Sequence, residues 1–137
     1  MRYNDAYIND VRDLAEKLEL NGRDVLKRLT NAQIRKCING IGSASMPKAV
    51  RKALDALHPS LVIASHIHDC QWQYDCDGGR ADFLRTNADF QKNGIAMAKY
   101  LYSWYNPVRY IAILNARRFR KILDDFGWPA YKASFKG

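Results

Sequence analysis

The stretch Ser65-His66-Ile67-His68-Asp69-Cys70-Gln71-Trp72 lies within residues 60–75, which the sequence predicts to form a buried helix. Pro59 comes just before this segment and suits the first turn of a helix, whereas a pair of glycines soon after it suits the end of one. Residues three, four and seven positions apart share one face of a helix. His68 therefore lies on a stripe with a leucine and a tryptophan, and Asp69 lies at the edge of that stripe.

The two histidines of this stretch are poorly spaced for a zinc site. His66 and His68 are two residues apart, so they diverge on a helix. The neighbouring pair His68-Asp69 suits another chemistry, in which the imidazole takes a proton from water and the carboxylate binds a hard cation. The alternative is that both are ordinary polar residues on the flank of a helix, which is the commoner case for such a pair.

The rest of the chain also has helical periodicity. Apolar residues recur at helical spacing over about 4–20, 47–57, 80–104 and 108–126, and short helical stretches are expected near 23–29 and 34–37. Thr30 and Gln33 have the spacing of a capping box. No strand-like alternation of useful length and no internal repeat occurs. The sequence predicts an all-α fold that forms a single domain over residues 1–137.

Composition narrows the protein class further. Hydrophobic residues make up 47% of the 137 residues, which excludes disorder, and no apolar run approaches the ~20 residues that span a bilayer. The N-terminus shows an amphipathic pattern rather than the apolar core of a signal peptide, so we expect no export signal in this chain. Cys37, Cys70 and Cys76 are too few for a disulfide framework and are expected to be reduced.

Basic residues outnumber acidic ones by 22 to 14, which gives a formal net charge of +8. Residues 108–137, which begin with the last predicted helix at about 108–126, contain seven basic and two acidic residues and so carry a net charge of +5. A basic face attracts nucleic acid, anionic membranes or acidic partners, and charge alone does not choose among them. For a membrane partner we expect salt-sensitive binding to anionic lipid that depends on four residues, Arg117, Arg118, Arg120 and Lys121.

A short glycine loop joins the predicted helices 60–75 and 80–104, which favours an antiparallel pair. This pairing would turn the face that carries Asp82 and Asp89 towards His68. The two carboxylates share a helical face, so spacing does not choose between them. A second glycine-rich stretch, Asn39-Gly40-Ile41-Gly42, could present converging backbone groups to a ligand or could be an ordinary interhelical loop.

Three motifs occur in order along the chain: Asn39-Gly40-Ile41-Gly42, then His68-Asp69 with Trp72 four residues after the histidine, then Arg85-x-x-Ala88-Asp89-Phe90. In this combination, residues 30–95 resemble the phospholipase A2 superfamily, and especially its small bacterial and phage-encoded members. The chain departs from the secreted members because it lacks their paired cysteines and has Trp72 where they have a tyrosine.

The resemblance implies a calcium-dependent site that hydrolyses glycerophospholipid esters. His68 would be the general base, Asp69 a calcium ligand, and Asp89 the carboxylate that orients His68. Asp89 is preferred to Asp82 because only Asp89 matches the family motif. Further calcium ligands would be the backbone carbonyls of Ile38, Gly40 and Gly42. Calcium prefers six to eight oxygen ligands, and a bound ion would polarise the ester carbonyl.

Two other hypotheses compete with this one. The chain could be a non-catalytic helical protein whose basic face binds nucleic acid or an anionic membrane. The last helix lacks a recognisable turn-helix partner for DNA and an aromatic stacking platform for RNA. A metal phosphohydrolase ranks lower, because His58 is the only histidine outside the His66/His68 pair and such a site needs more ligands.

Overall fold

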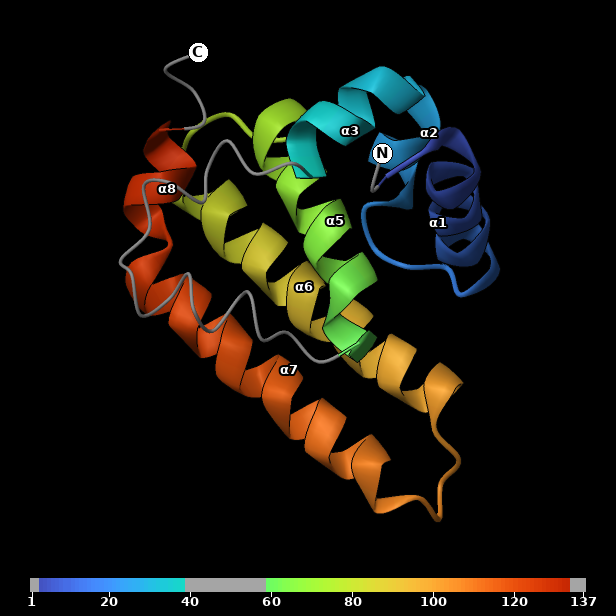
Figure 1. Ribbon diagram of the computed structural model, residues 1–137. Coiled ribbons are helices and arrows are strands. Elements are labelled where there is room, and N and C mark those ends of the chain that lie inside the picture. The colour runs from blue at the N-terminus through green and yellow to red at the C-terminus, as the bar shows by residue number, and fades with distance from the viewer. Residues whose placement is uncertain (1–2, 39–58, 134–137) are drawn as a thin grey trace.

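The computed structural model describes residues 3–38 and 59–133, and this part of the chain contains helices and no strand (Figure 1). The helices are α1 (Asp5–Lys17), α2 (Arg23–Arg28), α3 (Asn31–Ile38), α5 (Pro59–Tyr74), α6 (Arg80–Leu101), α7 (Pro107–Phe126) and α8 (Trp128–Ala133). The predicted all-α fold is confirmed. The predicted helix over 47–57 lies outside the described residues.

Helix α5 lies at the centre of the molecule. It runs antiparallel to α6, and α6 runs antiparallel to α7, as the sequence predicted for the first pair (Figure 1). Helices α2 and α3 pack against α5 away from α7, and α1 packs on both of them. The candidate residues of α5 therefore lie between two groups of helices rather than on an open surface.

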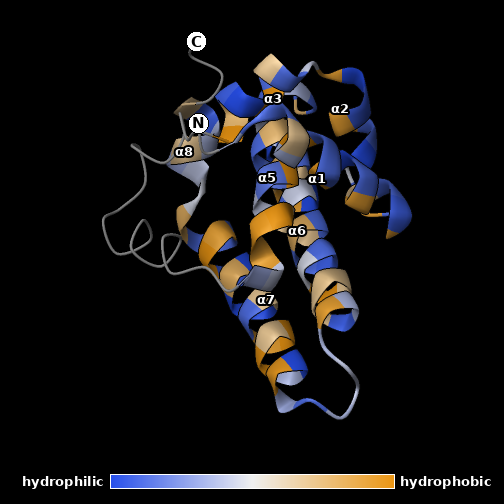
Figure 2. Cartoon of the chain, turned by 45° about the vertical axis from the view of Figure 1, so that its right-hand side comes forward, coloured by the Kyte–Doolittle hydropathy of each residue, from blue (hydrophilic) through white to orange (hydrophobic). Residues whose placement is uncertain are grey.

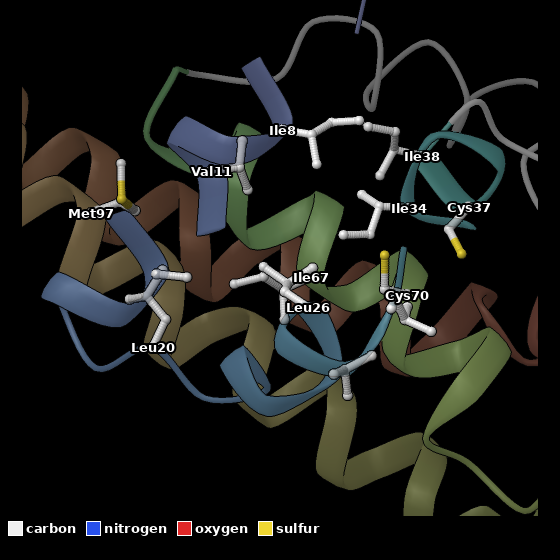
Figure 3. Packing of buried hydrophobic residues seen from close by; sticks show 13 residues of the cluster. Ile8, Val11, Leu20, Leu26, Ile34, Cys37, Ile38, Ile67, Cys70 and Met97 are labelled. Carbon is white, nitrogen blue, oxygen red and sulfur yellow. The ribbon is translucent and has the colours of Figure 1, made fainter. Parts of the chain in front are cut away.

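Helix α5 buries most of its side chains, and it does so against two different groups of helices. Leu61 and Ala64 pack in one cluster with residues of α6 and α7. Ile67 and Cys70 pack in a second cluster with residues of α1, α2 and α3, which Figure 3 shows from close by. All four side chains have no exposed surface. Apolar residues on two faces of α5 thus pack against different helices, so the sequence of α5 favours a position between them.

Local signals place several helix ends where the sequence predicted them. The backbone N–H of Thr30 donates to Gln33 Oε1 at 2.9 Å, and the N–H of Gln33 donates to Thr30 Oγ1 at 3.2 Å. This reciprocal pair is the predicted capping box. Between α1 and α2, Gly22 has a φ of +88°, and a Cβ there would lie 2.7 Å from Ile67 Cγ2 on α5. Glycine at this position lets the α1–α2 turn approach α5 closely.

Helix α8 was not predicted, because the last helix expected from the sequence ended at about residue 126. The structure does end α7 at Phe126, but a further short helix follows. The Tyr131 ring lies 5.3 Å from the rings of both Trp72 and Phe83. Tertiary packing of aromatic rings, and not local propensity, therefore stabilises α8.

Among the described residues, no helix has both the length and the apolar character needed to cross a membrane. Cys37, Cys70 and Cys76 are free thiols, as predicted.

Gly94 allows close packing of three helices. A Cβ on this residue of α6 would lie 2.7 Å from Leu61 Cδ2 on α5 and 3.0 Å from Ala116 Cβ on α7. Glycine lowers helix propensity, and the close packing of α6 with α5 and α7 gives the reason for a glycine there. Its missing side chain brings the backbones of α6 and α7 together.

We predict that Gly94→Val lowers the free energy of unfolding by about 2–3 kcal/mol, because the added methyl groups overfill a packed contact. Ala81→Val, on an exposed position of the same helix, is the control and should change stability by less than about 0.7 kcal/mol. Urea unfolding of both variants measures the difference. Equal stability of the two variants would show that the contact at Gly94 is loose.

Candidate active site

The side chain of His68 lies between α5 and α6, with 4% of the residue exposed. Its ring centroid is 4.4 Å from that of Trp72 and 5.7 Å from that of Phe90. The Nε2 atom lies 2.8 Å from Asn87 Oδ1. His68 is thus held on two sides by aromatic rings and at one nitrogen by an amide from the antiparallel helix.

The hydrogen bonds of Asn87 fix the tautomer of His68. Asn87 Nδ2 donates to Asp124 Oδ1 on α7 at 2.9 Å. A carboxylate only accepts, so the amide nitrogen of Asn87 must face Asp124 and its carbonyl must face His68. A carbonyl also only accepts, so the proton of the neutral imidazole lies on Nε2. The unprotonated atom is therefore Nδ1.

Burial lowers the pKa of His68 to about 4, and the hydrogen bond to Asn87 opposes this effect only in part. The imidazole is consequently neutral at pH 7 and can accept a proton at Nδ1. Asn87 stabilises an imidazolium less than a carboxylate would, because its oxygen carries only a partial charge. Asp124 supplies the negative charge of this network from one residue further away.

The predicted role of Asp89 as the partner of His68 is corrected by these contacts. Asp89 accepts hydrogen bonds from Asn21 at 3.2 Å and from Gln71 at 3.0 Å, and it lies 3.7 Å from a guanidinium nitrogen of Arg85. Asn87 is two residues earlier on α6, and its helical position turns it towards His68 instead. Asp89 joins the α1–α2 turn to α5 and α6.

The other candidate carboxylate on α6 also lies away from His68. Asp82 accepts from the backbone N–H of Asp77 at 3.0 Å and from Arg85 Nε at 3.3 Å. It therefore stabilises the start of α6 and the loop before it. The family motif favoured Asp89 over Asp82 as the partner of His68. In the structure, Asn87 makes that contact instead of either carboxylate.

Asp69, the next residue after His68, is half-buried. No described residue donates a hydrogen bond to its carboxylate or forms an ion pair with it. Burial raises its pKa to about 7. An oxygen ligand with this uncompensated charge fits a hard cation such as calcium.

The other predicted calcium ligands are only partly described. Ile38 is the last residue of α3, and it packs in the same cluster as Cys70, the neighbour of Asp69 (Figure 3). The end of α3 therefore lies beside the helix that carries Asp69. Gly40 and Gly42 lie outside the described residues. Within residues 3–38 and 59–133, no three histidine, cysteine or acidic side chains gather as a metal site, so a cation at Asp69 would need backbone oxygens.

His66 confirms that the two histidines diverge. Its Nε2 atom lies 2.8 Å from the hydroxyl oxygen of Tyr7 on α1, on the other side of α5 from Asn87. This contact joins the N-terminal helix to the central one. His66 therefore has a structural partner and stands apart from the His68 site, as the spacing predicted.

Sequence reasoning missed Asn87 and Asp124. A signal for Asn87 was present, because it lies four residues after Phe83 and three before Phe90, and all three are buried on one stripe of α6. A polar residue on such a stripe must find a partner. Asp124 gave no comparable signal, since its contact depends on how α7 crosses α6.

Comparisons of this chain with protein-family models, with curated proteins and with solved structures find no match. The geometry described above is therefore the basis for the functional proposal.

We predict that His68 stays neutral, with its proton on Nε2, down to about pH 4. Because the unfolded chain takes up this proton near pH 6.5, stability that is present above pH 6.5 should be lost as the pH falls from 6.5 to about 4. Long-range ¹H–¹⁵N correlation spectra report both the tautomer and the titration. Asn87→Asp should raise the pKa of His68, because a carboxylate stabilises the imidazolium.

A His68 resonance that titrates near its ordinary pKa, or that shows the proton on Nδ1, would contradict this network. His66 in the same spectra serves as the internal comparison.

Asp69 should have the opposite pH dependence. Its pKa is raised in the folded state, so the protonated form stabilises the fold and that stability is lost as the pH rises through about 7. Without calcium, Asp69→Asn should therefore stabilise the protein at pH 8 by about 1–2 kcal/mol. This gain should shrink as the pH falls through about 7 and vanish below the ordinary pKa value of 3.8. Asp13→Asn, at an exposed position of α1, is the control. Thermal unfolding in a chelator measures both, and a pH-independent effect of Asp69→Asn would refute the assignment.

Proposed function

We propose that this protein is a calcium-dependent hydrolase of glycerophospholipid esters, similar in its site to the phospholipase A2 superfamily. The observation that carries the proposal is the chain of hydrogen bonds from His68 through Asn87 to Asp124, with Asp69 next to His68 on the same helix. A hydrolase of this kind needs a neutral base with one nitrogen held and the other available. It also needs an oxygen ligand for a cation close to that base.

The base in this proposal is Nδ1 of His68, which takes a proton from the attacking water. Asn87 is a positioning residue, because it holds Nε2 and so sets the orientation of the ring. Asp124 faces Asn87 with one oxygen, and its other oxygen lies 3.5 Å from Arg120 Nε. The charge of Asp124 favours the imidazolium that forms when His68 accepts the proton. This charge acts through the amide, so we expect a weaker base than a directly paired histidine.

Asp69 would hold calcium together with backbone oxygens at the end of α3 and in the glycine loop that follows it. When bound, calcium would polarise the ester carbonyl and stabilise the oxyanion that forms there. Two features of the described residues support this assignment of Asp69. Its carboxylate has no compensating partner among them. The helix that carries it also packs against α3, whose last carbonyls lack partners within that helix.

The proposal predicts a specific pattern of activity losses. His68→Gln should lower calcium-stimulated release of fatty acid from phospholipid by about 10²- to 10⁴-fold, because it removes the base. Asn87→Ala should lower it by about 10- to 100-fold by misorienting the ring. Asp69→Asn should remove the calcium dependence itself. Release of fatty acid from mixed micelles, with calcium or with a chelator, measures all three.

Asp89→Asn is the matched control, because Asp89 lies two residues from Asn87 on the same helix but contacts other partners. It should keep most of the activity. Isothermal titration with calcium separates loss of the ion from loss of the base, since His68→Gln should still bind calcium. Absence of both calcium binding and hydrolysis in the wild-type protein would refute the enzyme proposal.

A further inference from the structure

The turn between α6 and α7 presents exposed aromatic residues at the end of a helical hairpin. Trp104 and Tyr105 are each 72% exposed, and their rings are 5.7 Å apart. Figure 1 shows that this turn projects beyond α5 and away from α1, α2, α3 and α8. The neighbouring apolar residues are also exposed on α6 and α7, namely Tyr100, Leu101, Tyr110, Ile111 and Leu114. We call this set, with Trp104 and Tyr105, the hairpin tip.

Several hydrogen bonds hold the hairpin tip in shape. The hydroxyl of Tyr110 donates to the carbonyl of Trp104 at 2.6 Å. The side chain of Asn106 accepts from the N–H of Val108 at 3.0 Å and so caps α7. The backbone N–H of Asn106 also donates to the carbonyl of Ser103. The exposed rings are therefore presented by an ordered turn, which reduces the conformational entropy lost on binding.

The charge around the hairpin tip has one sign. From residue 90 to residue 123, the chain has seven basic residues and no acidic residue. Lys99 is exposed beside the tip, and Arg117 and Arg118 are exposed on α7 and form no ion pair with any described residue. Arg117 lies about 10 Å along the helix from Tyr110, at the 1.5 Å rise of an α-helix. These three exposed basic residues, Lys99, Arg117 and Arg118, follow the apolar end, and we call them the basic collar. Figure 2 shows that hydrophobic and hydrophilic segments alternate along α7.

We propose that the hairpin tip docks on an anionic phospholipid surface, with its rings in the headgroup region and the basic collar against the lipid phosphates. Tryptophan and tyrosine favour this region because their rings are amphipathic. The leucine and isoleucine of the tip add apolar area that stacking on nucleic-acid bases would not need. Basic residues near such a surface are attracted to its negative potential.

This inference goes beyond ester hydrolysis and can be tested apart from it. Binding is measured in a chelator, where no calcium-dependent reaction can occur, by co-sedimentation with vesicles of phosphatidylglycerol and phosphatidylcholine. The wild-type protein should bind these vesicles, bind pure phosphatidylcholine much less, and lose affinity as salt rises. Trp104 emission should shift to the blue on binding, because Trp104 is exposed whereas Trp72 is buried and Trp128 is half-buried.

Two variants separate the apolar from the basic contribution. The double variant Trp104→Ala, Tyr105→Ala should bind about tenfold more weakly and lose the blue shift. Neutralising Arg117 and Arg118 should weaken binding by about fivefold for each charge removed. Phe126→Ala is the matched control, because Phe126 is 50% exposed at the opposite end of α7. Far-UV circular dichroism checks that each variant is folded.

Unchanged vesicle binding by the Trp104/Tyr105 double variant would overturn the proposal. So would binding of the wild-type protein without a shift in Trp104 emission. Tighter binding to a single-stranded oligonucleotide that the double variant retains would assign the basic collar to nucleic acid instead.

Discussion

The central position of α5, which buries most of its side chains, is the constraint on which the rest of the structure depends. Polar side chains that this helix carries into the core find partners on neighbouring helices, because an unpaired buried polar group costs about 1–3 kcal/mol. The Oε1 atom of Gln71 is a buried exception. His66 meets Tyr7 of α1, and His68 meets Asn87 of α6. Gln71 donates to Asp89, and Trp72 donates to Thr86. These contacts set the register of α5 against α1 and α6. Apolar packing alone would let these helices slide along one another.

The same requirement creates the candidate active site. A buried histidine placed among aromatic rings loses its charge, and its partner then accepts a hydrogen bond without carrying a full charge. The side-chain carbonyl of Asn87 meets this need. Its amide nitrogen donates to Asp124, so α5, α6 and α7 share one polar network. Asp69 lies just outside this network and keeps a charge that no described residue balances. Neighbouring residues on one helix thus differ in chemistry because one faces the core and the other faces its edge.

The molecule has two ends with different physical character. At one end, aromatic rings in tilted and edge-on contact hold α8, and the hydroxyl of Tyr131 bonds to the loop before α6. Arg80 lies 5.0 Å from the ring of Trp128. At the other end, the α6–α7 hairpin leaves its aromatic residues exposed and surrounded by positive charge. Gly94 lies between the two ends and permits the close helix contact that supports the projecting hairpin. The aromatic residues therefore stabilise the fold at one end and are available to a partner at the other.

The sequence by itself determined the all-α fold, the antiparallel pairing of α5 with α6, the capping box at Thr30 and the divergence of His66 from His68. These features follow from periodicity and from contacts between residues close in the chain, which sequence spacing reports directly. Only the tertiary structure decided that Asn87, and not Asp89, contacts His68, and that Asp124 completes the network. One helical face contains several polar residues, and the crossing of α5, α6 and α7 selects which of them points inward. That crossing depends on side-chain volumes across the whole core, as the contact of Gly94 with Leu61 and Ala116 illustrates, and no local pattern encodes it.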